Sequence, residues 1–301
     1  MSAIFSKRSA ACTMPIISAS MQQRVWLTWI MLLVSLLVSG GVSHGASKIS
    51  AALTVRDALT APNHPARIIA RLIQKGMLTE TGLGGESLQL EVSGKVVGTA
   101  MTGGDGRAYF EYSPKMRGNV PFTVTLSPSP RVEASKASGL LGVWEHRRPI
   151  LFIEALALME ESGDPSGLSL PIGKKPLSEW KPQPDAAEEL SRLSQFYYNI
   201  VYLLDQRAED AEFRTWLNEH KFPVGVIIQT NTGTDGLGTL LDDLKTDGWT
   251  ATKNGIGRSR VFAETLLERR MEVVIVPEPS KGDTPRKAKT AKNWKEVRKQ
   301  L

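Results

Sequence analysis

The sequence predicts a two-domain α/β protein, in which a small β-sandwich is followed by a domain built on a parallel sheet. Apolar and polar residues alternate over residues 66–126, which is typical of half-buried strands. Beyond residue 148, short apolar runs alternate with segments of helical spacing, which favours a parallel sheet covered by helices. An uncharged apolar leader precedes both. With 301 residues, 41% of them hydrophobic, the chain has room for two packed domains.

The leader is the apolar run Val25–Val38, which contains no charged residue. Arg24 precedes it and small residues follow it, in the order that a secretory signal requires. Cleavage after Gly45 is plausible, because signal peptidase sites have small residues at positions −3 and −1, and here these are Ser43 and Gly45. The run is short for a membrane span of about 20 residues, although residues 25–42 together could serve as an anchor.

We therefore assign residues 1–45 to a signal peptide or N-terminal membrane anchor, and expect a periplasmic or extracellular protein. Membrane contact is expected only through this segment. Translation could start at Met1, Met14 or Met21, and Met21 gives the layout closest to a signal peptide. The single cysteine, Cys12, precedes the apolar run, so a cleaved chain would hold no thiol for disulfides, catalysis or metal binding.

The β-sandwich is assigned to residues 66–140, where glycine-rich turns separate short alternating runs. The apolar positions of three of these runs are Leu88, Leu90 and Val92, then Ala108, Phe110 and Tyr112, then Phe122, Val124 and Leu126. Several short strands with closely spaced turns are typical of an Ig-like sandwich. The stretch Gly98–Ala108 resembles the turn signature of bacterial Ig-like and carboxypeptidase-regulatory-like modules.

The α/β domain is assigned to residues 148–301. Buried strands are expected at 150–153, 200–204, 224–228 and 273–276. Helices are expected at 186–198, 211–220, 237–245 and 261–270, with a basic terminal helix at 288–301.

This second domain resembles a haloacid dehalogenase-like (HAD-like) phosphatase domain, and most closely the branch of phosphatidate phosphatase and lipin-type domains. Arg148–Leu158 has the shape of the family's first strand and nucleophile loop. Residues 202–227 are similar to its second strand, helix and third strand, and Gly255–Ala263 to the loop that normally reads G-D-x-x-x-D-A. The resemblance implies a Rossmannoid parallel sheet with a site at the C-terminal ends of its strands.

The resemblance also implies chemistry for which the matched positions lack the groups. The family uses an aspartate nucleophile, an acid/base aspartate two residues later, and further acids that hold Mg²⁺. Here Glu154 is at the nucleophile position, and the other key positions carry Leu156, Leu204, Arg258 and Phe262. A guanidinium opposes a bound cation. We therefore expect a domain without catalytic activity and without a cofactor. Only if the site is active would Glu154 be catalytic and Mg²⁺ be required.

An anion site is the more specific hypothesis. Arg258 lies next to Ser259 in a glycine loop, and this pair could bind an anion even without a metal. The resemblance makes Lys245 or Lys253 a relic of the family's phosphate-binding lysine. We expect Glu154, Arg258 and Lys245 to converge at the C-terminal ends of the strands. A zinc site is not predicted, because no ligand spacing connects the histidines His64, His146 and His220.

The expected function is binding or envelope structure, with recognition of an anionic ligand through Lys245, Arg258 and Ser259. Two alternatives stay open. One is a divergent Mg²⁺-dependent phosphomonoester hydrolase of the same superfamily, using Glu154 with acids such as Asp164 or Asp205. The other is a purely structural envelope protein. No specific partner is predicted; three of the six net positive charges lie in the leader, and the remainder is too small to predict nucleic-acid binding.

Overall fold

The computed structural model describes residues 47–76, 79–160, 176–206, 208–230, 234–279 and 284–301. By its internal contacts the chain divides into two units, Met1–Ser47 and Lys48–Leu301. All three clusters of buried apolar side chains lie within Lys48–Leu301, so this unit has the core that independent folding requires. The predicted leader and its cleavage site lie outside the described residues. Within the described ranges, no helix combines the length and the apolar character needed to cross a membrane.

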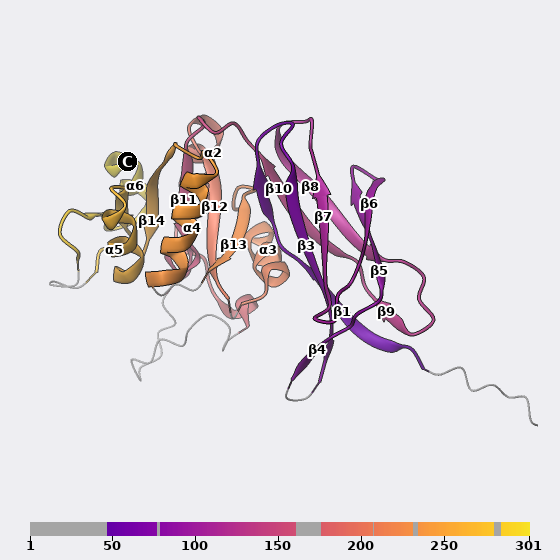
Figure 1. The fold of residues 1–301 in the computed structure, drawn as a ribbon. Coiled ribbons are helices and arrows are strands. Elements are labelled where there is room, and N and C mark those ends of the chain that lie inside the picture. The colour runs from indigo at the N-terminus through magenta and orange to yellow at the C-terminus, as the bar shows by residue number, and fades with distance from the viewer. Residues whose placement is uncertain (1–46, 77–78, 161–175, 207, 231–233, 280–283) are drawn as a thin grey trace, which may run out of the picture. The chain divides into compact units, whose positions relative to one another are not determined.

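The first part of Lys48–Leu301 is a β-sandwich of two five-stranded sheets (Figure 1). One sheet has the order β4-β3-β1-β9, with β7 also paired to β3, and the other has the order β2-β10-β8-β5-β6. The strands are β1 (Ile49–Val55), β2 (Ala58–Thr60), β3 (Ala66–Lys75), β4 (Glu80–Gly82), β5 (Ser87–Val92), β6 (Lys95–Met101), β7 (Arg107–Tyr112), β8 (Gly118–Leu126), β9 (Val132–Ala134) and β10 (Ala137–Val143).

The alternation in the sequence sets which side of each strand is buried. In β5, Leu88 and Leu90 are fully buried while Gln89 between them is partly exposed. The inward-facing side chains of both sheets form one apolar cluster, which includes Ile68, Phe110 and many smaller residues. Two strands, β1 and β2, precede Ala66 and belong to the same two sheets.

The second part is a six-stranded sheet in which every neighbouring pair of strands is parallel, in the order β13-β12-β11-β14-β15-β16. Its strands are β11 (Ile150–Glu154), β12 (Asn199–Asp205), β13 (Val226–Thr230), β14 (Thr252–Gly257), β15 (Glu272–Ile275) and β16 (Lys289–Thr290). Its helical elements are the 3₁₀ turns η1 (Ala155–Leu158) and η2 (Leu177–Glu179) and the helices α2 (Ala186–Phe196), α3 (Asp210–Glu219), α4 (Thr234–Thr246), α5 (Arg260–Glu268) and α6 (Trp294–Gln300).

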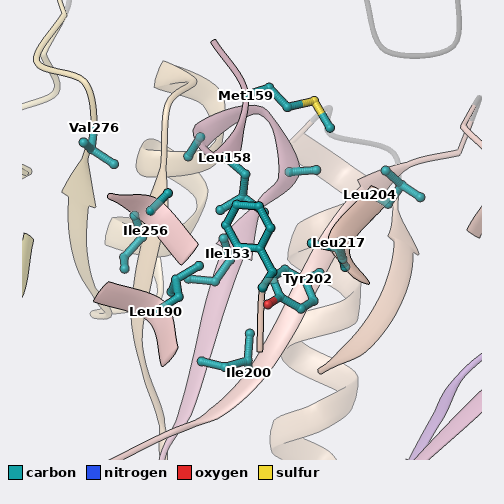
Figure 2. Close-up of a cluster of buried hydrophobic side chains, with 14 of the residues drawn as sticks. Ile153, Leu158, Met159, Leu190, Ile200, Tyr202, Leu204, Leu217, Ile256 and Val276 are labelled. Atoms are coloured by element: carbon teal, nitrogen blue, oxygen red, sulfur yellow. The ribbon is translucent and has the colours of Figure 1, made fainter. Parts of the chain in front are cut away.

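Helices cover both faces of this sheet, because its central strands are apolar on both sides. Leu151 and Ile153 of β11 face the cluster that contains buried residues of α2, α3 and α6. Figure 2 shows Ile153 in this cluster, together with Leu190 of α2 and Leu217 of α3. Ile150 and Phe152 face the other cluster, which contains residues of α4 and α5 together with Leu140 and Trp144 from the end of the sandwich. The predicted mixed architecture, β-sheets followed by an α/β part, is confirmed at this level.

One central strand, β14, was not predicted, because its sequence Thr-Lys-Asn-Gly-Ile-Gly is poor in strand-forming residues. Its glycines are required by close packing of α5. A Cβ on Gly257 would come within 2.1 Å of Phe262 Cδ1, and one on Gly255 within 2.2 Å of Leu266 Cδ2. A strand that reads as a loop is therefore stabilised by the helix that follows it.

Candidate functional site

The predicted site residue Glu154 is the last residue of β11, at the C-terminal edge of the parallel sheet. Its neighbour β14 ends at Gly257, so the following Arg258 and Ser259 lie beside it. Glu154 is 1% exposed, and its carboxylate accepts three hydrogen bonds. Oε2 accepts from the backbone N–H groups of Arg258 at 2.6 Å and Ser259 at 2.8 Å, and Oε1 accepts from Ser259 Oγ at 2.6 Å.

This arrangement is an anion site at the N-terminus of α5, with Glu154 as its anion. Ser259 is the N-cap residue, and its Oγ accepts from the Phe262 N–H at 3.2 Å while donating to Glu154. The positive end of the helix dipole stabilises the negative charge of the carboxylate. Residues that could have bound a free anion thus bind a carboxylate of the same chain.

The Arg258 side chain is also engaged, since its Nη1 donates to the Met159 carbonyl at 3.2 Å. This bond joins the start of α5 to the end of η1. Arg258 therefore holds the loop after β11 in place, and Glu154 ties the same loop region to α5.

Lys245 does not join Glu154 and Arg258. It is an exposed residue in the last turn of α4, and a connecting helix runs antiparallel to the strands of a parallel sheet. Its last turn therefore lies at the edge where the strands begin, opposite the edge that holds Glu154. Lys253 is exposed within β14, Asp205 ends β12, and Asp164 lies outside the described residues. The expected convergence of the three site residues is wrong for Lys245 and correct for the other two.

A second polar cluster, which sequence reasoning missed, connects the sandwich to the α/β part through Asp57. The Asp57 side chain is 2% exposed and lies between β1 and β2. Its Oδ1 accepts from the Leu140 N–H at 2.8 Å, and its Oδ2 accepts from the Ile227 N–H at 2.8 Å and from the guanidinium of Arg214. The pKa of Asp57 is raised overall, because the effect of burial is larger than the opposing effects of Arg214 and the two N–H groups. No sequence motif marks this residue, because its partners are distant in the chain.

Asp210, the first residue of α3, lies beside this cluster. Its pKa is raised to about 7, first by burial and then by the negative charge of Asp57. Its Oδ1 is buried and has no hydrogen-bond partner among the described residues. A carboxylate in such surroundings favours its protonated form near neutral pH.

Replacing Asp210 with asparagine should therefore stabilise the protein at about pH 8 and leave its stability near pH 4 unchanged. The pKa of Asp210 is about 7 in the folded protein, against ~3.9 in an unfolded chain. The folded state thus binds the proton more tightly, and the wild type loses stability as the pH rises from about 4 to about 7. We expect the variant to gain roughly 1–3 kcal/mol at about pH 8, measured by urea denaturation at both pH values.

The control is Asp243→Asn, which removes an exposed carboxylate from α4. It should leave the pH dependence of stability as in the wild type. If the difference in stability between Asp210→Asn and the wild type were the same at both pH values, the raised pKa of Asp210 would be contradicted.

No family model matches this chain, and no curated protein matches it either. Among the solved structures similar to it is the CARDB domain of a Pyrococcus furiosus protein, with 14% identity and a TM-score of 0.23, covering 31% of this chain and 92% of that one. The fibronectin(III)-like modules of Clostridium thermocellum CbhA show 14% identity and a TM-score of 0.22, covering 30% of this chain and 94% of that one. A cycloisomaltooligosaccharide glucanotransferase from Paenibacillus shows 12% identity and a TM-score of 0.25, covering 75% of this chain and 28% of that one.

The β-sandwich predicted for residues 66–140 is confirmed by the two five-stranded sheets of the structure, which begin earlier in the chain, at β1. The predicted resemblance to a HAD-like phosphatase domain is wrong, because none of the similar structures found is a HAD-like phosphatase. The matched positions also have a different physical role. Leu204 (Figure 2) and Phe262 are core residues on opposite faces of the sheet, and Leu156 packs against the core. The sequence resembled that family in the pattern of its apolar residues and not in its catalytic residues.

Proposed function

We propose that this chain is an exported binding protein of the cell envelope without hydrolytic chemistry of its own. One observation carries the proposal. The carboxylate at the predicted nucleophile position, Glu154, makes three hydrogen bonds within its own fold and is 1% exposed. A nucleophile must reach its substrate, and a buried carboxylate whose oxygens already accept from Arg258 and Ser259 serves instead to hold α5 in place.

Export is the second half of the proposal and rests on the sequence of residues 1–45. An uncharged apolar run after Arg24, followed by small residues up to Gly45, is the layout that the secretion machinery cleaves. The cysteine-free remainder suits an oxidising compartment, because no free thiol is left to react.

The test is to express the full chain with a C-terminal tag in a bacterium, fractionate the cells and determine the N-terminus of the protein. We expect a product that begins at Ala46 and is recovered outside the cytoplasm. The same purified protein should show no Mg²⁺-dependent hydrolysis of an aryl phosphate. Cytoplasmic protein with an intact leader would overturn export, and turnover that is lost in a folded Glu154→Gln variant would overturn the non-catalytic assignment.

A further inference from the structure

The segments that lead into the strands of the parallel sheet all lie at one edge of it, because the strands run in the same direction. This edge is opposite the one that holds Glu154, which ends β11. We call it the basic edge and define it by the residues that immediately precede the six strands. These residues are 144–149, 196–198, 219–225, 246–251, 268–271 and 284–288.

The basic edge carries an excess of exposed positive charge. Six of its cationic side chains are exposed and make no ion pair within the described ranges, namely Arg147, Arg148, Lys221, Arg270, Arg286 and Lys287. Of its acids, Glu145 and Glu268 are ion-paired. Glu219 and Asp247 are then its only acids without an ion pair among the described residues. Unpaired cations therefore outnumber unpaired acids by six to two.

Two of these cations occupy positions where glycine would fit the backbone better. Lys221 and Arg270 have φ angles of 59° and 61°, in the left-handed region that glycine adopts without steric cost. Each is the second residue after its helix, in a turn closed by two backbone hydrogen bonds. The equivalent turn after α4 has Gly248 at this position, with a φ of 90°. The basic edge thus keeps a cation at two positions where the local backbone favours glycine.

The same edge also exposes large apolar side chains. Phe196, Tyr197 and Val224 are 68%, 61% and 58% exposed, and the rings of Phe196 and Tyr197 lie 6.3 Å apart. In the described part of the α/β domain, the other exposed large hydrophobic residue is Val261. Most of the exposed large apolar side chains of this domain therefore lie beside the unpaired cations. Aromatic rings next to cations are typical of protein surfaces that enter the headgroup region of a bilayer.

We propose that the basic edge binds the surface of an anionic phospholipid bilayer. Lys221 leads into β13 and Lys287 into β16, and these are the two outermost strands of the sheet. With about 4.8 Å between neighbouring strands, the cations are spread over roughly 24 Å. Charges spread over this width match many lipid headgroups, whereas a single small anion would need them gathered in one place. This inference rests on the proposed binding function and names its partner.

The experiment uses the unit Lys48–Leu301, which lacks the apolar leader, and measures its sedimentation with vesicles. We expect binding to vesicles of phosphatidylglycerol and phosphatidylcholine in equal amounts, and little binding to phosphatidylcholine alone. Binding should weaken as added salt screens the charges. The double variant Lys221→Gly/Arg270→Gly should bind roughly tenfold more weakly or worse, because each cation near an anionic leaflet contributes a factor of about five. Its Tm should not fall, since glycine fits the left-handed backbone at both positions.

The matched control is Lys95→Gln/Lys136→Gln, which removes two exposed cations from the sandwich and should bind vesicles like the wild type. A third variant, Phe196→Ser/Tyr197→Ser, should weaken binding and keep its salt dependence, because the charges remain.

Three results would each overturn the proposal: no binding of the wild type to the anionic vesicles, equal losses in the two charge variants, or tighter binding of a single-stranded oligonucleotide than of the vesicles. Export is tested on the full chain by its N-terminus and its location, and turnover by hydrolysis. Failure of the proposed function is therefore distinguishable from failure of membrane binding.

Discussion

Replacing Asp57 with alanine should lower the free energy of unfolding by about 3–5 kcal/mol. The buried N–H groups of Leu140 and Ile227 would lose their acceptor, and Arg214 would lose the counter-ion of its 23%-exposed side chain. Groups that stay buried without partners cost far more than the net value of the bonds they made. Because a protein of this kind is stable by about 5–15 kcal/mol, the loss is a large fraction of the total. Urea denaturation followed by circular dichroism measures it.

A double-mutant cycle separates the ion pair from the two backbone bonds. Asp57→Ala and Arg214→Ala together should cost less than the sum of the two single changes, because they share one interaction. The variant Asp57→Asn keeps the side-chain volume and one acceptor oxygen, so it should lose less stability than the alanine variant. A loss below about 1 kcal/mol for Asp57→Ala would mean that water replaces its contacts and that the cluster does not hold the sandwich to the α/β part.

Replacing Glu154 should have the second largest effect. Glu154→Ala leaves the buried N–H groups of Arg258 and Ser259 without an acceptor, and we expect a loss of roughly 3 kcal/mol. Glu154→Gln keeps one acceptor but loses the charge that the N-terminus of α5 favours, so roughly 1–2 kcal/mol should be lost. Thermal or urea denaturation gives these values, and hydrogen exchange at the first turn of α5 should report the same order.

Ser259→Ala is the matched comparison for this site, because it removes the N-cap hydroxyl and its bond to Glu154 Oε1 but leaves the two backbone N–H groups bonded to Oε2. It should cost about 1 kcal/mol. The result also discriminates between the two roles considered for Glu154. Catalytic groups are often held at a cost in stability, so their replacement tends to be neutral or stabilising. A Glu154→Ala variant as stable as the wild type would therefore argue against the structural role.

The sequence alone predicted most elements, and the reason is local. Helices and strands bury one face or both, and this requirement leaves a period of 3.6 or 2 residues in the apolar pattern. That pattern placed α2, α3, β11 and β12 to within about two residues. It failed for β14, whose glycines are explained only by the position of Phe262 and Leu266 in the packed protein.

The sequence also identified Glu154, Arg258 and Ser259 as neighbours, but for a reason that proved wrong. They meet because Glu154 accepts hydrogen bonds from the two residues just before α5, and not because they are remnants of a phosphatase site. Lys245 lies at the opposite edge because a helix that connects two parallel strands runs antiparallel to them, so its last turn lies where the strands begin.

By itself, the sequence determined the apolar run Val25–Val38, the absence of cysteine after it, the succession of a β-sandwich and an α/β part, and which residues are apolar enough to form cores. Tertiary structure alone decided what the polar residues do. Asp57 meets groups that are 83, 157 and 170 residues away, and Glu154 meets groups 104 and 105 residues away. Apolar burial can be predicted from the local periodicity of the sequence, whereas a buried charge needs hydrogen-bond partners that only the folded chain brings together.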